Sequence, residues 1–144
     1  MSRIVVGIDA SEHAIRALEW ALNQAALQGA DVEMVCAIQA PDTAALPDLT
    51  SRFDDRELRT AAEHVLATAL EKASAGRESP PRVTRTVTVG APAPVLCRAA
   101  EGADLIVVGA RGLGGFKGLL VGSVSHQVVS HAPCPVVVVT PPRR

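Results

Sequence analysis

A glycine-rich stretch in the last third of the chain has the residue types that bind phosphate. Residues 108–123 read VGARGLGGFKGLLVGS; they follow the apolar run Leu105–Val108 and lead into a helical segment at Ser123. Glycine lets a backbone turn tightly and approach a ligand closely, and a helix start offers unpaired N–H groups at the positive end of its dipole. From the apolar run to the end of the chain there is no acidic residue, whereas Arg111 and Lys117 are basic. The stretch therefore predicts a phosphate-binding loop.

Two widespread nucleotide motifs do not fit this loop. The sequence contains no G-x-x-x-x-G-K-[ST] run, which excludes a Walker-type NTPase. Gly112, Gly114 and Gly118 miss the G-x-G-x-x-G spacing by one residue and follow a late strand, with no acid downstream. A dinucleotide-binding fold is therefore weakly supported. The alternative to phosphate binding is that the glycines merely shape a tight surface loop.

Asp9 is the acidic residue best placed to face this loop. It comes directly after the apolar run Ile4–Ile8, which is typical of a strand buried on both faces. In open parallel sheets, ligands bind at the carboxyl ends of the strands where the strand order reverses. If the strands that end near Asp9 and Gly109 are neighbours, the Asp9 carboxylate and the glycine loop face each other. This arrangement suits a nucleotide, with Asp9 binding a ribose hydroxyl and the loop binding the phosphates. The alternative is that Asp9 only caps the following helix.

Strand-like and helix-like segments alternate along the whole chain. Strands are predicted over 4–8, 31–38, 82–89, 105–109 and 135–140, and helices over about 12–29, 54–75, 90–100 and 123–130. This order predicts one doubly wound α/β domain over residues 1–144, with a mainly parallel sheet. The 82–89 segment alternates apolar and polar residues, which indicates a half-exposed strand at a sheet edge.

Composition excludes several classes of function. The net charge is −1 and aromatic residues make up 2% of the chain, which argues against nucleic-acid binding by charge or by base stacking. No apolar run approaches the ~18 residues needed to cross a bilayer, and the first residues lack a secretory signal. We therefore expect a cytoplasmic protein without membrane contact. Cys36, Cys97 and Cys134 are expected to be small buried residues.

Three glycines and a serine in the last third of the chain have a spacing that resembles the motif of a known family. Gly109, Gly112, Gly122 and Ser123 form the pattern G-x2-G-x9-G-[ST]. Together with IVVGIDAS at residues 4–11 and APCPVVVV near the end, this pattern resembles the ATP-binding branch of the universal stress protein family over nearly the whole chain. The resemblance implies a Rossmann-like five-stranded sheet in the order 3-2-1-4-5, with helices on both faces. It also implies a homodimer through the last strand, Val136–Val139, whose exposed edge would otherwise stay unpaired.

The resemblance also implies a set of site residues for ATP. Asp9 would contact ribose, the backbone near Ala37 adenine, and the segments after the fourth strand and before the fourth helix the phosphates. Arg111 is added because of its charge, although it and Lys117 are equally well explained as solvated surface charges. The candidate site residues are Gly7, Asp9, Ser11, Ala37, Val108, Gly109, Arg111, Gly112, Gly122, Ser123, Val124 and Ser125.

We expect a nucleotide-dependent sensor or regulator in the stress response, with an unidentified protein partner. No acid near the loop is placed for phosphoryl transfer, so ATP hydrolysis is expected to be negligible or slow. No metal-ligand set is predicted, and any Mg²⁺ would be held by the phosphates and water. The segment 39–53 is the expected moving part. The alternatives are a nucleotide-free dimeric interaction protein, with the glycine loop purely structural, and a slow ATP hydrolase.

Overall fold

The computed structural model describes residues 2–39, 55–111 and 122–142. Gly112, Lys117 and all of the predicted moving segment except Gln39 lie outside the described residues, so the expectations for them stay predictions. Nine elements alternate along the rest of the chain. They are β1 (Arg3–Gly7), α1 (Glu12–Gln28), β2 (Asp31–Ile38), α2 (Asp55–Ser74), β3 (Val83–Val89), α3 (Pro92–Ala99), β4 (Leu105–Gly109), α4 (Ser123–His131) and β5 (Val136–Val139).

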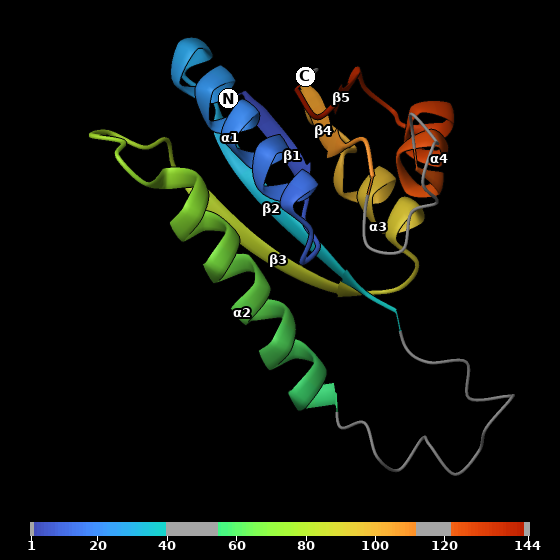
Figure 1. Ribbon diagram of the computed structural model, residues 1–144. Coiled ribbons are helices and arrows are strands. Elements are labelled where there is room, and N and C mark those ends of the chain that lie inside the picture. The colour runs from blue at the N-terminus through green and yellow to red at the C-terminus, as the bar shows by residue number, and fades with distance from the viewer. Residues whose placement is uncertain (1, 40–54, 112–121, 143–144) are drawn as a thin grey trace, which may run out of the picture.

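The five strands form one parallel sheet in the order β3-β2-β1-β4-β5 (Figure 1). The predicted fold class and strand order are therefore confirmed, and so is the edge position of β3. In register, Val6 of β1 pairs with Met34 of β2 on one side and with Val107 of β4 on the other. The carboxyl ends of β1 and β4 are consequently neighbours, as the candidate site requires.

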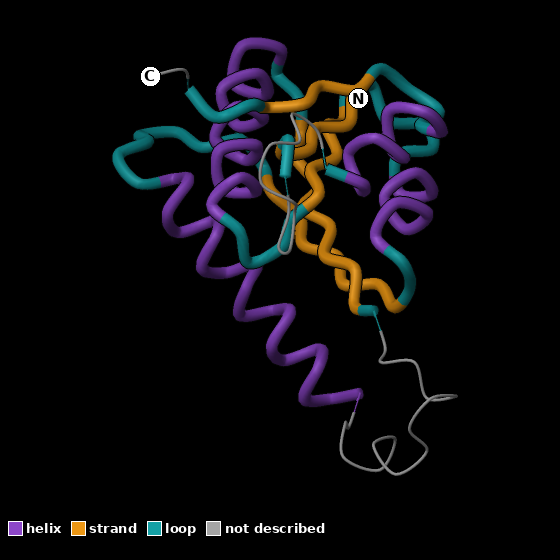
Figure 2. The backbone as a smooth tube through the Cα atoms, turned by 45° about the vertical axis from the view of Figure 1, so that its right-hand side comes forward, coloured by secondary structure: helices purple, strands orange, loops and turns teal. Residues whose placement is uncertain are grey.

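Helices cover both faces of the sheet, which Figure 2 shows from the side. On one face α1 and α2 pack on an apolar cluster that includes Leu18, Leu66 and Met34. On the other face α3 and α4 pack on a second cluster that includes Leu96, Val128 and Ile106. The core is built mainly from Val, Ile, Leu and Ala, which lets helices lie close to the sheet.

Local signals fix the ends of α1. The hydroxyl of Ser11, the N-cap residue, accepts a hydrogen bond of 3.2 Å from the backbone N–H of Ala14. At the other end Gly29 adopts the left-handed conformation, φ 67°, that ends helices and that other residues adopt with strain. These two residues set the length of α1 and so fix where its first turn meets the end of β4.

Arg3 ties three elements together at the opposite, amino end of the sheet. Its guanidinium donates to the carboxylate of Glu33 at 2.6 Å and to the carbonyl oxygens of Ala99 at 2.9 Å and Glu101 at 2.8 Å. The two carbonyls lie at the C-terminal end of α3, where a cation is favoured by the helix dipole. The side chain therefore anchors α3 to β1 and β2.

Replacing Arg3 by alanine is expected to lower the free energy of unfolding by about 2 kcal/mol. The change removes one partly exposed ion pair and leaves two carbonyls without their charged donor. Denaturant titration measures the effect. Arg98→Ala, which removes an exposed arginine from α3, serves as control and should change stability by less than about 0.5 kcal/mol. Equal effects of the two substitutions would contradict the anchoring role.

Candidate functional site

The candidate site lies where the chain leaves β1 and β4. From these neighbouring strands the connections diverge, because α1 packs on one face of the sheet and α4 on the other. This divergence is the reversal point at which parallel α/β sheets bind ligands. Asp9 follows β1 by two residues, and Arg111 follows β4 by two residues. The structure thus brings the predicted acid and the predicted basic residue to one edge of the sheet.

Asp9 organises the turn between β1 and α1. Its Oδ1 accepts a 2.8 Å hydrogen bond from the backbone N–H of Ser11 and a second one from the Ser11 hydroxyl. The N-cap of α1 is therefore Ser11, and Asp9 holds that cap in place instead of capping the helix itself. The carboxylate is half-buried, so it stays in reach of a ligand hydroxyl at this edge.

Gly109 permits a backbone contact that no other residue type would allow. A Cβ atom at this position would lie 2.8 Å from the carbonyl oxygen of His13 and 2.9 Å from its Cβ. The end of β4 therefore touches the first turn of α1 directly. The sequence predicted that Gly109 lets the backbone approach a ligand or, as the alternative, shapes a tight loop, and it gave no reason to single out His13. A contact between segments 96 residues apart leaves no signal in one sequence.

The start of α4 is tied back to the segment after β4. Gly122 is its N-cap residue, and the Gly122 N–H donates to the carbonyl oxygen of Ala110 at 2.6 Å. Gly122 has no side chain that can accept from the first-turn N–H groups of Ser123, Val124 and Ser125. Those donors are left for other acceptors, which is the arrangement that helix starts use to bind anions.

Ser125 has a partner that the sequence did not predict. Its side chain is buried, and its hydroxyl lies 3.0 Å from the carbonyl oxygen of Ala110 and 3.2 Å from that of Gly122. A hydroxyl with these partners braces the turn before α4. The geometry therefore favours a structural role for the Ser125 side chain.

The remaining candidates lie along the same edge with different exposure. Ala37 is half-buried in the last part of β2, and Val108 is buried in β4. Gly7 ends β1, and a Cβ there would lie 2.8 Å from a methyl carbon of Leu96 in α3. Gly7 is thus explained by packing against α3. Arg111 is half-buried at the point where the described segment ends.

The cysteines are not activated. Burial raises the pKa of the Cys36 thiol above its ordinary value, and the negative charges of Asp9 and Glu63 raise it further. Burial also raises the pKa of Cys97 and that of Cys134. A protonated thiol is a poor nucleophile and metal ligand, which favours a structural role. Cys36 is buried as expected, but Cys97 and Cys134 are only half-buried, so the expectation of burial was wrong for these two.

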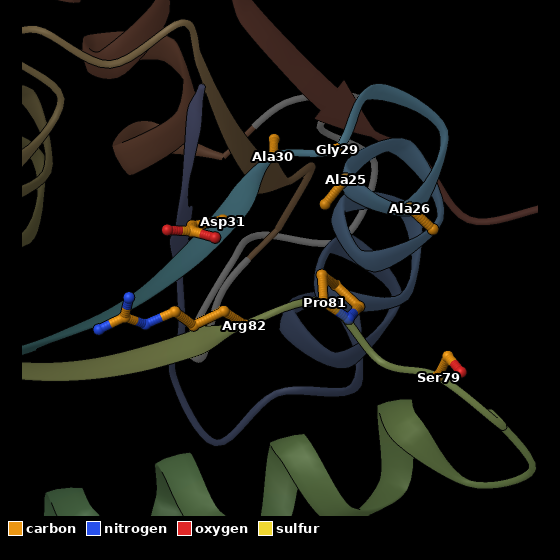
Figure 3. A pocket seen from close by; sticks show the side chains of 8 residues that line it. All are labelled: Ala25, Ala26, Gly29, Ala30, Asp31, Ser79, Pro81 and Arg82. Atoms are coloured by element: carbon orange, nitrogen blue, oxygen red, sulfur yellow. The ribbon is translucent and has the colours of Figure 1, made fainter. Parts of the chain in front are cut away.

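A separate pocket of about 330 Å³ opens at the far end of the sheet (Figure 3). Its lining comes from the end of α1, the start of β2 and the segment before β3. Alanine, glycine and proline form much of it, with Asp31, Arg82 and Ser79 as the polar members. The pocket lies at the amino ends of β2 and β3, so it is distinct from the candidate site.

Two absences hold within the part of the chain that the structure describes. Within it, no group of three or more His, Cys, Asp or Glu side chains is arranged to hold a metal ion. No helix in the described ranges is both long enough and apolar enough to cross a bilayer.

Comparison with known proteins gives consistent matches over nearly the whole chain. The model of the universal stress protein family matches residues 1–140. A universal stress protein of Thermus aquaticus is 38% identical over 94% of this chain and 96% of its own length. One from Mycobacterium tuberculosis is 36% identical over 94% of this chain but 46% of its own length. The chain thus spans about half the length of this mycobacterial relative.

Solved structures match at the level of the fold. UspA from Lactobacillus plantarum superposes with a TM-score of 0.80 at 29% identity, covering 96% of this chain and 97% of that one. A universal stress protein in complex with cAMP superposes with a TM-score of 0.67 at 28% identity, covering 96% of this chain and 95% of that one.

Proposed function

The chain belongs to the universal stress protein family, and on that premise we propose that it binds an adenine nucleotide, ATP first, at the carboxyl ends of β1 and β4. The observation that carries the proposal is that Asp9 and the uncapped start of α4 both follow the carboxyl ends of β1 and β4, where the strand order reverses. The related protein solved with cAMP lends support, because it takes an adenine nucleotide on the same fold.

The described residues suit the parts of a nucleotide in different ways. Asp9 offers a half-buried carboxylate oxygen for a ribose hydroxyl, and charge-assisted hydrogen bonds of this kind are strong. The N–H groups of Ser123, Val124 and Ser125 suit phosphate oxygens, and Arg111 adds a positive charge nearby. Adenine would rest on the backbone near Ala37. With three aromatic residues in the whole chain, base recognition would depend on backbone hydrogen bonds and aliphatic packing.

We infer a binding protein that changes its partners with nucleotide occupancy, acting as one nucleotide-binding domain. Its role as a stress-response sensor, its regulatory partner and its cytoplasmic location stay predictions. Mg²⁺, if it accompanies ATP, would be held by the phosphates and water. A nucleotide-free interaction protein would share this fold, and the binding experiment below separates the two.

Replacing Asp9 by asparagine is expected to weaken binding of MgATP about 10- to 100-fold, measured by calorimetric titration. The asparagine side-chain oxygen can still accept the Ser11 N–H, so the free energy of unfolding should change by about 1 kcal/mol or less. Asp31→Asn makes the same chemical change at the opposite end of the sheet and should leave binding unchanged. Absence of binding by the unaltered, nucleotide-free protein would refute the proposed function. Binding that Asp9→Asn leaves intact would refute the ribose assignment.

We also propose that two copies pair through β5. Ala110 N–H bonds to the Val139 carbonyl and Ile106 N–H to the Pro135 carbonyl, so the alternate residues Val136 and Val138 direct their backbone groups away from β4. β5 is an edge strand of the sheet, and its valines are only half-buried. Pairing around a twofold axis would satisfy this edge and bury those side chains. Sedimentation equilibrium should show a dimer that Val138→Lys dissociates; an unchanged dimer would place the interface elsewhere.

A further inference from the structure

The opposite edge of the sheet, the outer side of β3, has a row of outward backbone groups that pair with no strand among the described residues. The Val32 N–H donates to the Arg82 carbonyl at 2.9 Å, and the Gly90 N–H donates to the Ile38 carbonyl at 2.8 Å. Alternate residues of a parallel strand bond to the same neighbour. Both bonds, with the register of β2 and β3, assign Thr84, Thr86 and Thr88 to the ladder with β2. The residues that face outward are Val83, Arg85, Val87 and Val89.

This edge is long and open in the described part of the chain. β3 has seven residues, contains no proline, and is the last strand in the sheet order (Figure 1). The contact described on its outer side is the guanidinium of Arg59 in α2, which donates to the Val87 carbonyl at 3.5 Å. Val89 is 51% exposed. Edge strands of this kind are templates for a further strand unless something blocks them.

The positive charge along the outer edge of β3 indicates which kind of strand could bind there. Arg59 and Arg85 are both exposed there, and β3 itself contains no acidic residue. Pairing of two β3 strands would bring arginine side chains of like charge together, which is destabilising. The β5 strand of another copy, Val136–Val139, offers no carboxylate to neutralise them. An acidic strand from a different protein suits the edge better than a second copy.

We infer that the outer edge of β3 binds an extended acidic segment of a partner protein, which adds to the sheet as a sixth strand. Backbone hydrogen bonds to the outward groups would supply affinity, and carboxylates of the partner opposite Arg59 and Arg85 would supply specificity. The inference goes beyond nucleotide binding and does not depend on it, because none of the outward residues of β3 belongs to the proposed nucleotide site.

The probe is a blocked peptide of eight residues that alternates aspartate and valine, titrated into the full ¹⁵N-labelled chain. We expect saturable amide shifts at Val83, Arg85, Val87 and Val89, and no comparable binding of the matching lysine–valine peptide. Equal binding of the two peptides, shifts centred elsewhere, or no shifts at all would overturn the inference.

Two variants and a control test the two parts of the contact. Arg59→Glu with Arg85→Glu should weaken binding of the acidic peptide by about tenfold or more, whereas Arg98→Glu on α3 should not. Arg85→Pro removes an outward N–H while leaving the β2–β3 ladder intact, so it should abolish binding in a folded protein. Equal weakening by Arg98→Glu would show that net charge alone acts and would also overturn the inference.

Discussion

Replacing Gly109 by alanine should lower the free energy of unfolding by about 3 kcal/mol, because the added methyl group overlaps main-chain atoms. The Cβ would lie 2.8 Å from the carbonyl oxygen of His13 and 2.9 Å from its carbonyl carbon. Main-chain atoms in the first turn of a helix cannot move aside singly, so α1 must shift away from β4. The midpoint temperature of thermal unfolding, Tm, should fall by roughly 6–12 °C for a chain of this size.

Two further glycines at the same edge give matched controls for this prediction. At Gly7 the new Cβ meets methyl groups of Leu96, which can rotate, and a cost of about 1 kcal/mol is expected. At Gly122 the nearest atom is the Ala110 carbonyl oxygen at 3.3 Å, and φ of −73° suits any residue. Equal losses of stability in the three alanine variants would contradict the close approach of β4 and α1.

Replacing Gly122 by valine should weaken binding of MgATP about 100-fold, equivalent to ~2.7 kcal/mol. The branched side chain would project beside the first-turn N–H groups of α4 that we assign to phosphate. Valine is also a poor N-cap residue, so a loss of stability of about 1 kcal/mol should accompany the change. Calorimetric titration measures binding, and denaturant titration measures stability on the same preparation.

Gly122→Ser separates the loss of binding from the loss of stability. Serine is a preferred N-cap residue, so stability should stay near that of the unaltered protein. Its hydroxyl would accept from the same N–H groups and compete with phosphate, so binding should still weaken. Undiminished binding in both variants would show that the start of α4 does not hold phosphate, whereas a loss that only accompanies unfolding would show that Gly122 is structural.

The fold could be predicted well because its signals are local. The apolar run at residues 4–8 and the Thr-Arg-Thr-Val-Thr alternation in β3 correctly indicated a central strand and an edge strand. The limits of the first strand differ from the prediction by one residue at each end, since β1 spans Arg3–Gly7. The register of β1 with β4 ends at Val6, and Ile8, beyond it, donates its N–H to the Val35 carbonyl at 2.9 Å. Strand order came from the family resemblance, because pairing between distant segments has no local signature.

The contacts inside the candidate site could not be predicted from the sequence. Gly109 packs against His13 in the first turn of α1, and Gly7 packs against Leu96. The Ser125 hydroxyl donates to the carbonyl oxygen of Ala110. Each partner lies at least 15 residues away along the chain, and only the packed fold brings it close. The residue types that bring a backbone near phosphate are also those that bring two backbones together, so spacing alone did not separate the two roles.

Mapping MgATP binding onto the chain tests the central claim most directly. The protein should first be freed of any nucleotide that accompanies it through purification, and its ¹⁵N-labelled amides followed as MgATP is added. We expect saturable shifts concentrated at residues 9–11, 109–111 and 123–125, around the carboxyl ends of β1 and β4. No saturable shifts, or shifts centred on the far pocket at 25–31 and 79–82, would contradict it.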